Sequence, residues 1–367
     1  MTWLLPTRGT LLASLLSLGS RTIFEEQSCI IFHAYCKMAS SVASVEAWLD
    51  SSQSAFNELA FGSTETLIVD KDAQSISSAL TGSTACGDLP DADDDDTNSE
   101  SSEYTTVPSE YFEKITVAGR RMSKAFPDSW EFIDERAELS SMLQHHLWLL
   151  LNDGRLHNSP ISRPTRVINI GAGFGHWSID FADKNREVDV LAIDRLPILP
   201  ALVPPNLTAT YDDIFSGLPC REETCDLAYL RQVVWCVDYH YLFCQAFELL
   251  KPGAWIEFSW LALKHQTWES LASKIGDCTG RRFPTLEDVD DSLKQARFLN
   301  IKGSTRQAPA MGSPNALDIR GHILPPLLRG LGMNDAEAEL LAVEVNRTLS
   351  LDMVEFCSVW AQKPLKA

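Results

Sequence analysis

A short apolar stretch that runs directly into three alternating glycines restricts the fold more than any other part of this sequence. Residues 167–177 read Val-Ile-Asn-Ile-Gly-Ala-Gly-Phe-Gly-His-Trp, with the glycines at Gly171, Gly173 and Gly175. Glycine is needed where a backbone turns sharply and approaches a ligand closely. A helix predicted over 176–184 would add free N–H groups and partial positive charge at its first turn. The junction therefore predicts a strand–loop–helix unit that binds a ligand.

The segments around this loop alternate between strand and helix, which is typical of a parallel sheet covered on both faces. Apolar residues at helical spacing predict a helix over 135–151, ahead of the sheet. We therefore expect an α/β fold with a mostly parallel, doubly wound sheet and helices on both faces. Its strands are predicted at 166–170, 189–193, 207–211, 225–230 and 254–260, with a further helix at 239–250.

The spacing of the glycines bears on the kind of cofactor. Dinucleotide-binding folds use Gly-x-Gly-x-x-Gly, whereas here the third glycine comes one position early, at Gly175. Such a loop suits a cofactor without a pyrophosphate, such as S-adenosyl-L-methionine. Asp194 follows the second strand, where an acid can accept hydrogen bonds from both ribose hydroxyls, and Asp212-Asp213 follow the third, where a carboxylate can meet the adenine amino group. The predicted cofactor-binding residues are Asn169, Gly171, Gly173, Gly175, Asp194, Asp212, Asp213 and Arg231.

Several stretches of this sequence match a known family in their order along the chain. They include Leu143-Gln-His-His-Leu-Trp148, Asn152-Asp-Gly-Arg-Leu156, Gly175-His-Trp-Ser-Ile-Asp-Phe-Ala182 and Leu250-Lys-Pro-Gly-Ala-Trp-Ile-Glu257. Residues from about 110 to 367 thereby resemble the LaeA-like class of fungal methyltransferases, associated with secondary metabolism. The resemblance implies a Rossmann-like class I methyltransferase fold, S-adenosyl-L-methionine as cofactor, and methyl transfer to an O, N or C atom of a small molecule.

The sequence departs from that family at three places. Asn169 stands where an aspartate is usual, Ala172 and Phe174 replace the threonines of Thr-Gly-Thr, and Ser140-Ser141-Met142 replace Arg-Leu-Asp. Asn169 lacks the charge that would face the ammonium group of the cofactor. Loss of a charged partner typically costs about 1.5–3 kcal/mol, or roughly ten- to a hundredfold in affinity. Phe174 adds bulk where the methionine part of the cofactor should lie.

Candidate catalytic groups are few, because methyl transfer chiefly needs its reactants held in line and shielded from water. His145 and His146 are the candidate bases, and since consecutive helix positions face different directions, at most one should point into the site. The alternative is one packed and one exposed histidine. Arg231 either binds an acidic group or pairs with Asp226, and the pairing is favoured. Glu257 lies inside a strand and is expected to face the acceptor pocket without being catalytic.

Residues 261–355 are expected to form the acceptor side of the site. A helix that begins after Asn334, its predicted N-cap, should cover the pocket as a lid. Apolar and aromatic residues of this region suit a hydrophobic small molecule, although most such residues belong to a core. Those singled out are Trp260, Trp268, Phe283, Met311, Leu324, Pro325 and Pro326.

Three regions are expected along the chain. Residues 1–37 are a leader of uncertain status or a gene-model extension, 38–107 are an acidic, Ser- and Asp-rich stretch too polar to order itself, and 108–367 are the methyltransferase domain. We expect an intracellular protein, cytoplasmic or nuclear, with organellar or secretory targeting left open by the first segment.

The net charge and the cysteine pattern limit the kinds of ligand and partner that we expect. A formal net charge of −19 disfavours direct nucleic-acid binding, and the nine cysteines contain no Cys-x-x-Cys pair, so no metal site is expected. No membrane span is visible. The expected partners are a small-molecule acceptor and, through the acidic leader, a regulatory protein.

Three functions therefore stay open. The first is a small-molecule methyltransferase of secondary metabolism. The second is a regulator that keeps the fold and acts through protein partners. The third is the same fold recruited to a non-methylating cyclisation or dehydration, while the glycine spacing disfavours a dehydrogenase.

Overall fold

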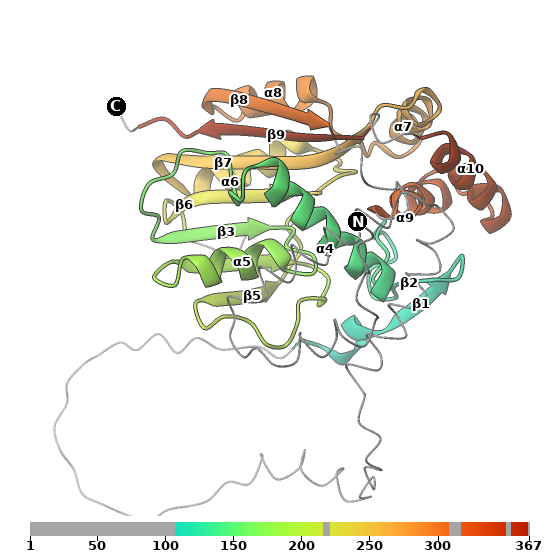
Figure 1. The fold of residues 1–367 in the computed structure, drawn as a ribbon, viewed down its shortest axis with the longest axis horizontal. Helices are drawn as coiled ribbons and strands as arrows, with labels where there is room; N and C mark the ends of the chain where they lie inside the picture. Colours follow the sequence, from blue (N-terminus) through green and yellow to red (C-terminus); the bar gives the residue numbers. More distant parts are fainter. Residues whose placement is uncertain (1–106, 216–220, 308–316, 350–353, 366–367) are drawn as a thin grey trace, which may run out of the picture. The chain divides into compact units, whose positions relative to one another are not determined.

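The computed structural model describes residues 107–215, 221–307, 317–349 and 354–365 (Figure 1). The predictions made for residues 1–106 and for Met311 concern parts of the chain outside these ranges. None of the helices in the described ranges is long and apolar enough to cross a membrane.

A seven-stranded sheet in the order β5-β4-β3-β6-β7-β9-β8 forms the centre of the domain. All neighbouring strands from β5 to β7 pair in parallel, whereas β9 is antiparallel to both β7 and β8. This confirms the predicted mostly parallel α/β sheet. The strands are β3 (Arg166–Ile170), β4 (Asp189–Asp194), β5 (Leu207–Tyr211), β6 (Cys225–Arg231), β7 (Leu250–Leu263), β8 (Leu299–Gln307) and β9 (Val354–Gln362).

Helices cover both faces of the sheet, as predicted for a doubly wound fold (Figure 1). On one face α5 (His176–Lys184) packs Trp177 and Phe181 against β3 and β4, and α4 (Glu135–Leu151) lies beside it. On the other face, α6 (Tyr239–Leu249) and α8 (Leu286–Gln295) form a second apolar layer with the sheet. Residues of β3 alternate between these two layers, because successive side chains of a strand point to opposite faces.

A third apolar cluster lies beyond the carboxyl ends of the parallel strands, where Figure 1 shows β1, β2, α7, α9 and α10 gathered. The β1–β2 hairpin was not among the predicted elements, because its four-residue strands carry mixed polar and apolar side chains. The elements of this region are η3 (Ser109–Phe112), β1 (Lys114–Val117), β2 (Arg120–Ser123), α7 (Gln266–Thr279), α9 (Ile319–Pro325), η5 (Pro326–Gly330) and α10 (Asp335–Thr348).

Arg120 ties this added layer to the sheet domain. Its guanidinium contacts Asp134 at 2.5 Å and Asp318 at 3.0 Å. Asp134 is also the N-cap of α4, where it accepts a hydrogen bond from Ala137 N at 3.0 Å, and Asp318 directly precedes α9. One half-buried cation therefore joins the hairpin, the start of α4 and the start of α9.

Glu257 does not face the acceptor pocket, so that prediction was wrong. Its side chain is 1% exposed and its carboxylate accepts hydrogen bonds from Asn158 N at 2.7 Å and Ser159 N at 2.8 Å. It lies beside Tyr229 in the middle of the sheet, on the face covered by α5, rather than at the carboxyl end of β7. Burial raises the pKa of Glu257, and the N–H donors oppose that shift.

We predict that Glu257→Gln lowers the free energy of unfolding by about 2 kcal/mol, because the new amide nitrogen would face backbone N–H donors. Denaturant unfolding of the variant measures this loss. The matched control is Glu187→Gln, which changes an exposed glutamate in the loop before β4 and should leave stability almost unchanged. Equal unfolding free energies for both variants would contradict the structural role of Glu257.

Candidate functional site

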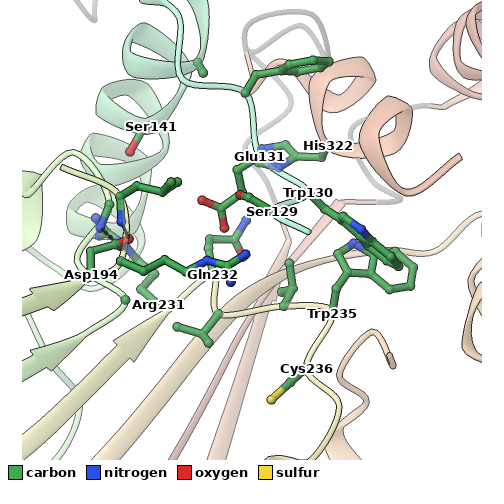
Figure 2. Close-up of a pocket in the computed structure, with 18 of the residues that line it drawn as sticks. Ser129, Trp130, Glu131, Ser141, Asp194, Arg231, Gln232, Trp235, Cys236 and His322 are labelled. Atoms are coloured by element: carbon green, nitrogen blue, oxygen red, sulfur yellow. Dashed lines mark hydrogen bonds between the residues drawn. The ribbon is translucent and has the colours of Figure 1, made fainter. Parts of the chain in front are cut away.

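A cavity of about 610 Å³ opens at the carboxyl ends of β3, β4 and β6 (Figure 2). β3 lies between β4 on one side and β6 on the other, so the chain continues in opposite directions across the sheet from this point. Ligands of open α/β sheets bind in the crevice at such a reversal of strand order. The cavity therefore lies where the fold predicts a binding site.

The three glycines all have left-handed backbone conformations, with φ of 71° at Gly171, 56° at Gly173 and 78° at Gly175. Gly171 and Gly173 line the cavity, and a Cβ at Gly171 would lie 2.5 Å from a methyl carbon of Val233. Gly175 does not line it. It precedes α5 and packs against Leu199, which a Cβ would approach to 3.2 Å. The first two glycines thus shape the cavity, and the third shapes the entry into the helix.

Asp194 ends β4 and holds the glycine loop in place. Its Oδ2 accepts a hydrogen bond from Gly173 N at 2.7 Å, and its Oδ1 accepts one from Leu196 N at 2.9 Å. The side chain is 9% exposed, and burial raises its pKa while the N–H donors oppose that shift. A carboxylate has about four acceptor positions, so Asp194 can still accept hydrogen bonds from a ligand in the cavity that it lines.

The two acids after β5 have different surroundings. Asp213 lines the cavity, whereas Asp212 does not. The Asp212 carboxylate instead accepts a hydrogen bond from Asp213 N at 2.8 Å and so fixes the turn. Of this predicted pair, only Asp213 is placed to meet a ligand.

Asn169 lines the cavity and is 2% exposed. Its Nδ2 donates to Ser178 Oγ at 2.8 Å, while its Oδ1 is buried and has no hydrogen-bond partner among the described residues. An unsatisfied buried acceptor costs about 1–3 kcal/mol, which a ligand with an N–H donor would recover. The ammonium group of S-adenosyl-L-methionine is such a donor, so the residues present fit this cofactor. Phe174 lines the same cavity, as expected.

Neither of the two predicted catalytic histidines lines the cavity. His145 is 3% exposed and lies between Asp180 Oδ2 and Arg231 Nη1, each 2.9 Å from one of its ring nitrogens. Burial lowers its pKa to about 3, so the ring is neutral at physiological pH. His146 Nδ1 is 2.8 Å from Met142 O of its own helix. The structure thus places both side chains beside the site, with another group between His145 and the cavity.

That group is Arg231, the last residue of β6, which lines the cavity (Figure 2). The favoured pairing of Arg231 with Asp226 was wrong. Asp226 lies at the other end of β6, where its carboxylate binds Lys251 Nζ at 2.9 Å and Thr165 N at 2.7 Å. Four residues of extended chain lie between Asp226 and Arg231, which puts the two side chains too far apart for contact.

The far side of the cavity is aromatic, but sequence reasoning identified only part of it. Trp268 and Phe283 line the cavity as predicted. Trp260 is instead buried in the sheet and stacks on Phe258 with ring centroids 5.0 Å apart. Leu324, Pro325 and Pro326 are buried without lining the cavity.

The helix that was predicted to cover the pocket, α10, is not the helix that lines it. Asn334 caps α10 as expected, accepting from Glu337 N at 3.0 Å, but α10 does not line the cavity. It packs against α9, which contributes Ile319 and His322 to the lining. The helical layer over this part of the site is therefore α9, and α10 supports it from behind.

The segment between β2 and α4 was missed as a functional region. It contributes Trp130, whose ring lies 5.4 Å from that of Trp235, and Glu131, whose carboxyl group is directed into the cavity on the side of Asp194 (Figure 2). Loss of solvation and the charge of Asp194 raise the pKa of Glu131 to about 7. In the sequence, this region shows only the run Trp130-Glu131-Phe132 shortly before Asp134, the N-cap of α4. That run does not match a known functional motif.

Comparisons with known proteins agree with this arrangement. Residues 143–304 match the family described as "Methyltransferase domain". The chain is 34% identical over 122 residues to the "Secondary metabolism regulator LAE1" of Cochliobolus heterostrophus, covering 31% of this chain and 40% of that protein. It is 32% identical over 130 residues to the "Probable methyltransferase tdiE" of Emericella nidulans, covering 33% and 38%. This chain thus spans less than half the length of either relative.

Among solved structures, a phosphoethanolamine N-methyltransferase 2 of Haemonchus contortus is 14% identical, with a TM-score of 0.42, over 68% of this chain and 60% of that one. At this identity and TM-score, the likeness carries no argument about this chain. The strand order, the glycine loop and the sequence matches agree with one another. The chain therefore carries a Rossmann-like methyltransferase domain whose cofactor is S-adenosyl-L-methionine, and it is related to the LaeA-like fungal methyltransferases of secondary metabolism.

Proposed function

We propose that this protein transfers the methyl group of S-adenosyl-L-methionine to an aromatic or otherwise planar apolar small molecule. One observation carries the proposal: a single cavity joins the polar ends of β3, β4 and β6 to an aromatic wall. Methyl transfer requires donor and acceptor to share one space from which water is excluded.

The polar end of the cavity suits the cofactor. In this proposal Asp194 accepts hydrogen bonds from the ribose hydroxyls, Asp213 from the adenine amino group, and Asn169 Oδ1 from the ammonium group, and all three residues line the cavity. Gly171 and Gly173 let the backbone approach the ligand without side chains in between. The bound cofactor supplies a methyl group already activated on a sulfonium sulfur, so the residues of the chain mainly bind and orient.

The aromatic end suits the acceptor. Trp130, Trp235, Trp268 and Phe283 line it, and flat apolar surfaces of this kind bind ring systems by stacking and apolar burial. Glu131 projects into the space beside them and has no hydrogen bond or ion pair among the described contacts of the chain. With a pKa of about 7, its carboxylate can remove a proton from an acceptor hydroxyl or amine near neutral pH.

A regulatory function is the second candidate, and the name of a relative favours it. The Cochliobolus heterostrophus protein is called a secondary metabolism regulator. In this chain the acidic stretch within residues 38–107 would be the docking segment for a partner protein. A partner that stays bound after the cofactor site is disrupted would support this second function. A non-methylating reaction on the same fold would instead yield a product that gains no methyl group.

The cofactor site is tested by calorimetric titration of the full chain with S-adenosyl-L-methionine. We expect Asp194→Ala to weaken binding by at least about tenfold, since it removes charge-assisted hydrogen bonds and frees the glycine loop. Asp183→Ala, at an exposed position of α5, is the matched control and should bind like the wild type. If the folded wild type does not bind, the proposal fails. If it binds, a screen of aromatic acceptors by product mass follows.

Asn169 provides a second test of the same site. Asn169→Asp places a carboxylate opposite the ammonium group and should raise cofactor affinity by about tenfold, because charged hydrogen bonds are roughly twice as strong as neutral ones. Asn169→Leu removes the acceptor oxygen and should lower the affinity. If neither variant changes the dissociation constant, Asn169 does not contact the cofactor.

Glu131 is tested through stability, which needs no acceptor. Because its pKa is raised in the folded protein, ionising it costs stability as the pH rises from its ordinary value of 4.5 through about 7. Glu131→Gln should therefore melt at a higher temperature than the wild type at about pH 8, and at the same temperature near about pH 4. Glu110→Gln, at an exposed position, is the control. A difference that does not depend on pH would contradict the raised pKa.

A further inference from the structure

Arg231 is a cation held at the cavity without a carboxylate beside it. Its guanidinium lies at the carboxyl end of β6 and contacts His145 Nδ1 at 2.9 Å. None of the ion pairs found in the described ranges of the chain includes Arg231. The carboxylate of Asp180 is hydrogen-bonded to the other side of the His145 ring, so His145 lies between Asp180 and Arg231. Loss of solvation lowers the pKa of Arg231. A guanidinium in such surroundings is stabilised by an anion that enters the cavity.

The contacts of His145 fix how its ring is protonated. Arginine only donates hydrogen bonds, so Nδ1 must accept from Arg231. The ring proton is then on Nε2, which donates to Asp180 Oδ2 at 2.9 Å. Burial lowers the pKa of His145 to about 3, which keeps the ring neutral and able to accept. Three elements, α5, α4 and β6, therefore contribute one chain of hydrogen bonds that ends at the guanidinium.

A complementary group lies on the neighbouring strand. Asn169, whose buried Oδ1 lacks a partner, is on β3 opposite Tyr229, and Ile170 is opposite Leu230 of β6. Paired strands are about 4.8 Å apart, so a cation from β6 and a free acceptor from β3 end at the same part of the cavity. An α-amino acid carries a carboxylate and an ammonium on one carbon, and it would match these two groups together.

We infer that Arg231 binds the carboxylate of the cofactor's methionine moiety, and that Asp180 and His145 position the guanidinium for it. This assignment rests on the proposed cofactor site. Arg231 is the residue that touches the ligand, and His145 acts through it as a positioning residue. The pair of histidines identified in the sequence thus contributes to binding through one member, without proton transfer to the acceptor.

The test compares two ligands that differ only in this carboxylate: S-adenosyl-L-methionine and its decarboxylated analogue, which keeps the sulfonium and the amine. Calorimetric titration of the full chain should show that the wild type prefers S-adenosyl-L-methionine by about ten- to a hundredfold. Arg231→Met should abolish the preference by weakening the intact cofactor alone. Arg297→Met is the matched control, because Arg297 does not line the cavity and pairs with Glu248, and it should keep the preference.

Variants of His145 test the positioning role. Asn offers a side-chain oxygen near the place of Nδ1, so His145→Asn should keep most of the preference, whereas His145→Leu should lose most of it. Thermal unfolding of each variant establishes that it is folded. A full preference in folded His145→Leu would overturn the positioning role.

The outcomes separate this inference from the proposed function. If the wild type binds both ligands equally, the assignment of Arg231 is overturned and the cofactor site stands. If the wild type binds neither ligand, the proposed function itself fails. A preference that survives in folded Arg231→Met would overturn the assignment and indicate another cation as the carboxylate partner.

Discussion

The position of β3 between β4 and β6 is the constraint on which the site depends. Parallel pairing on both sides aligns the carboxyl ends of three strands, and each strand ends in a polar side chain: Asn169 near the end of β3, Asp194 on β4 and Arg231 on β6. The sharp turn at Gly171, where any side chain would strike Val233, then clears the space above them. The sheet topology and the glycine turn thus set the position of the binding site, and the side chains at the strand ends set its chemistry.

Charge is distributed unevenly around the resulting cavity. Asp194, Asp213 and Glu131 make one part acidic, and lost solvation together with the charge of Asp194 raises the pKa of Glu131 to about 7. Arg231 lies apart from them, backed by a neutral histidine rather than a carboxylate. A ligand with a diol at one end and a carboxylate at the other would meet a complementary partner at each. The remaining wall is aromatic and suits the second substrate.

The layer beyond the strand ends completes the site from distant parts of the sequence. Arg120 connects the β1–β2 hairpin to the starts of α4 and α9, so the segment that carries Trp130 and Glu131 is held against the sheet. α9 lines the cavity and α10 packs behind it. Capping and periodicity indicated α10 as a helix, but they could not show which of its neighbours it covers, because that depends on how the apolar faces of separate helices meet.

The sequence by itself determined the alternation of strands and helices along the chain, the glycine turn and the acid after β4. These features follow from local periodicity and backbone conformation. The same reasoning predicted a catalytic histidine, an Arg231–Asp226 pair and a pocket-facing Glu257, and the structure places these side chains elsewhere. Which side chains meet across elements was decided only by tertiary packing. His145 meets Asp180 and Arg231 because α4, α5 and β6 converge, and Glu257 meets the 158–159 loop because the sheet buries that face. Where a buried polar side chain points, and which group it binds, depends on distant parts of the sequence. The hydrogen bonds that offset its burial come from residues far away in the chain.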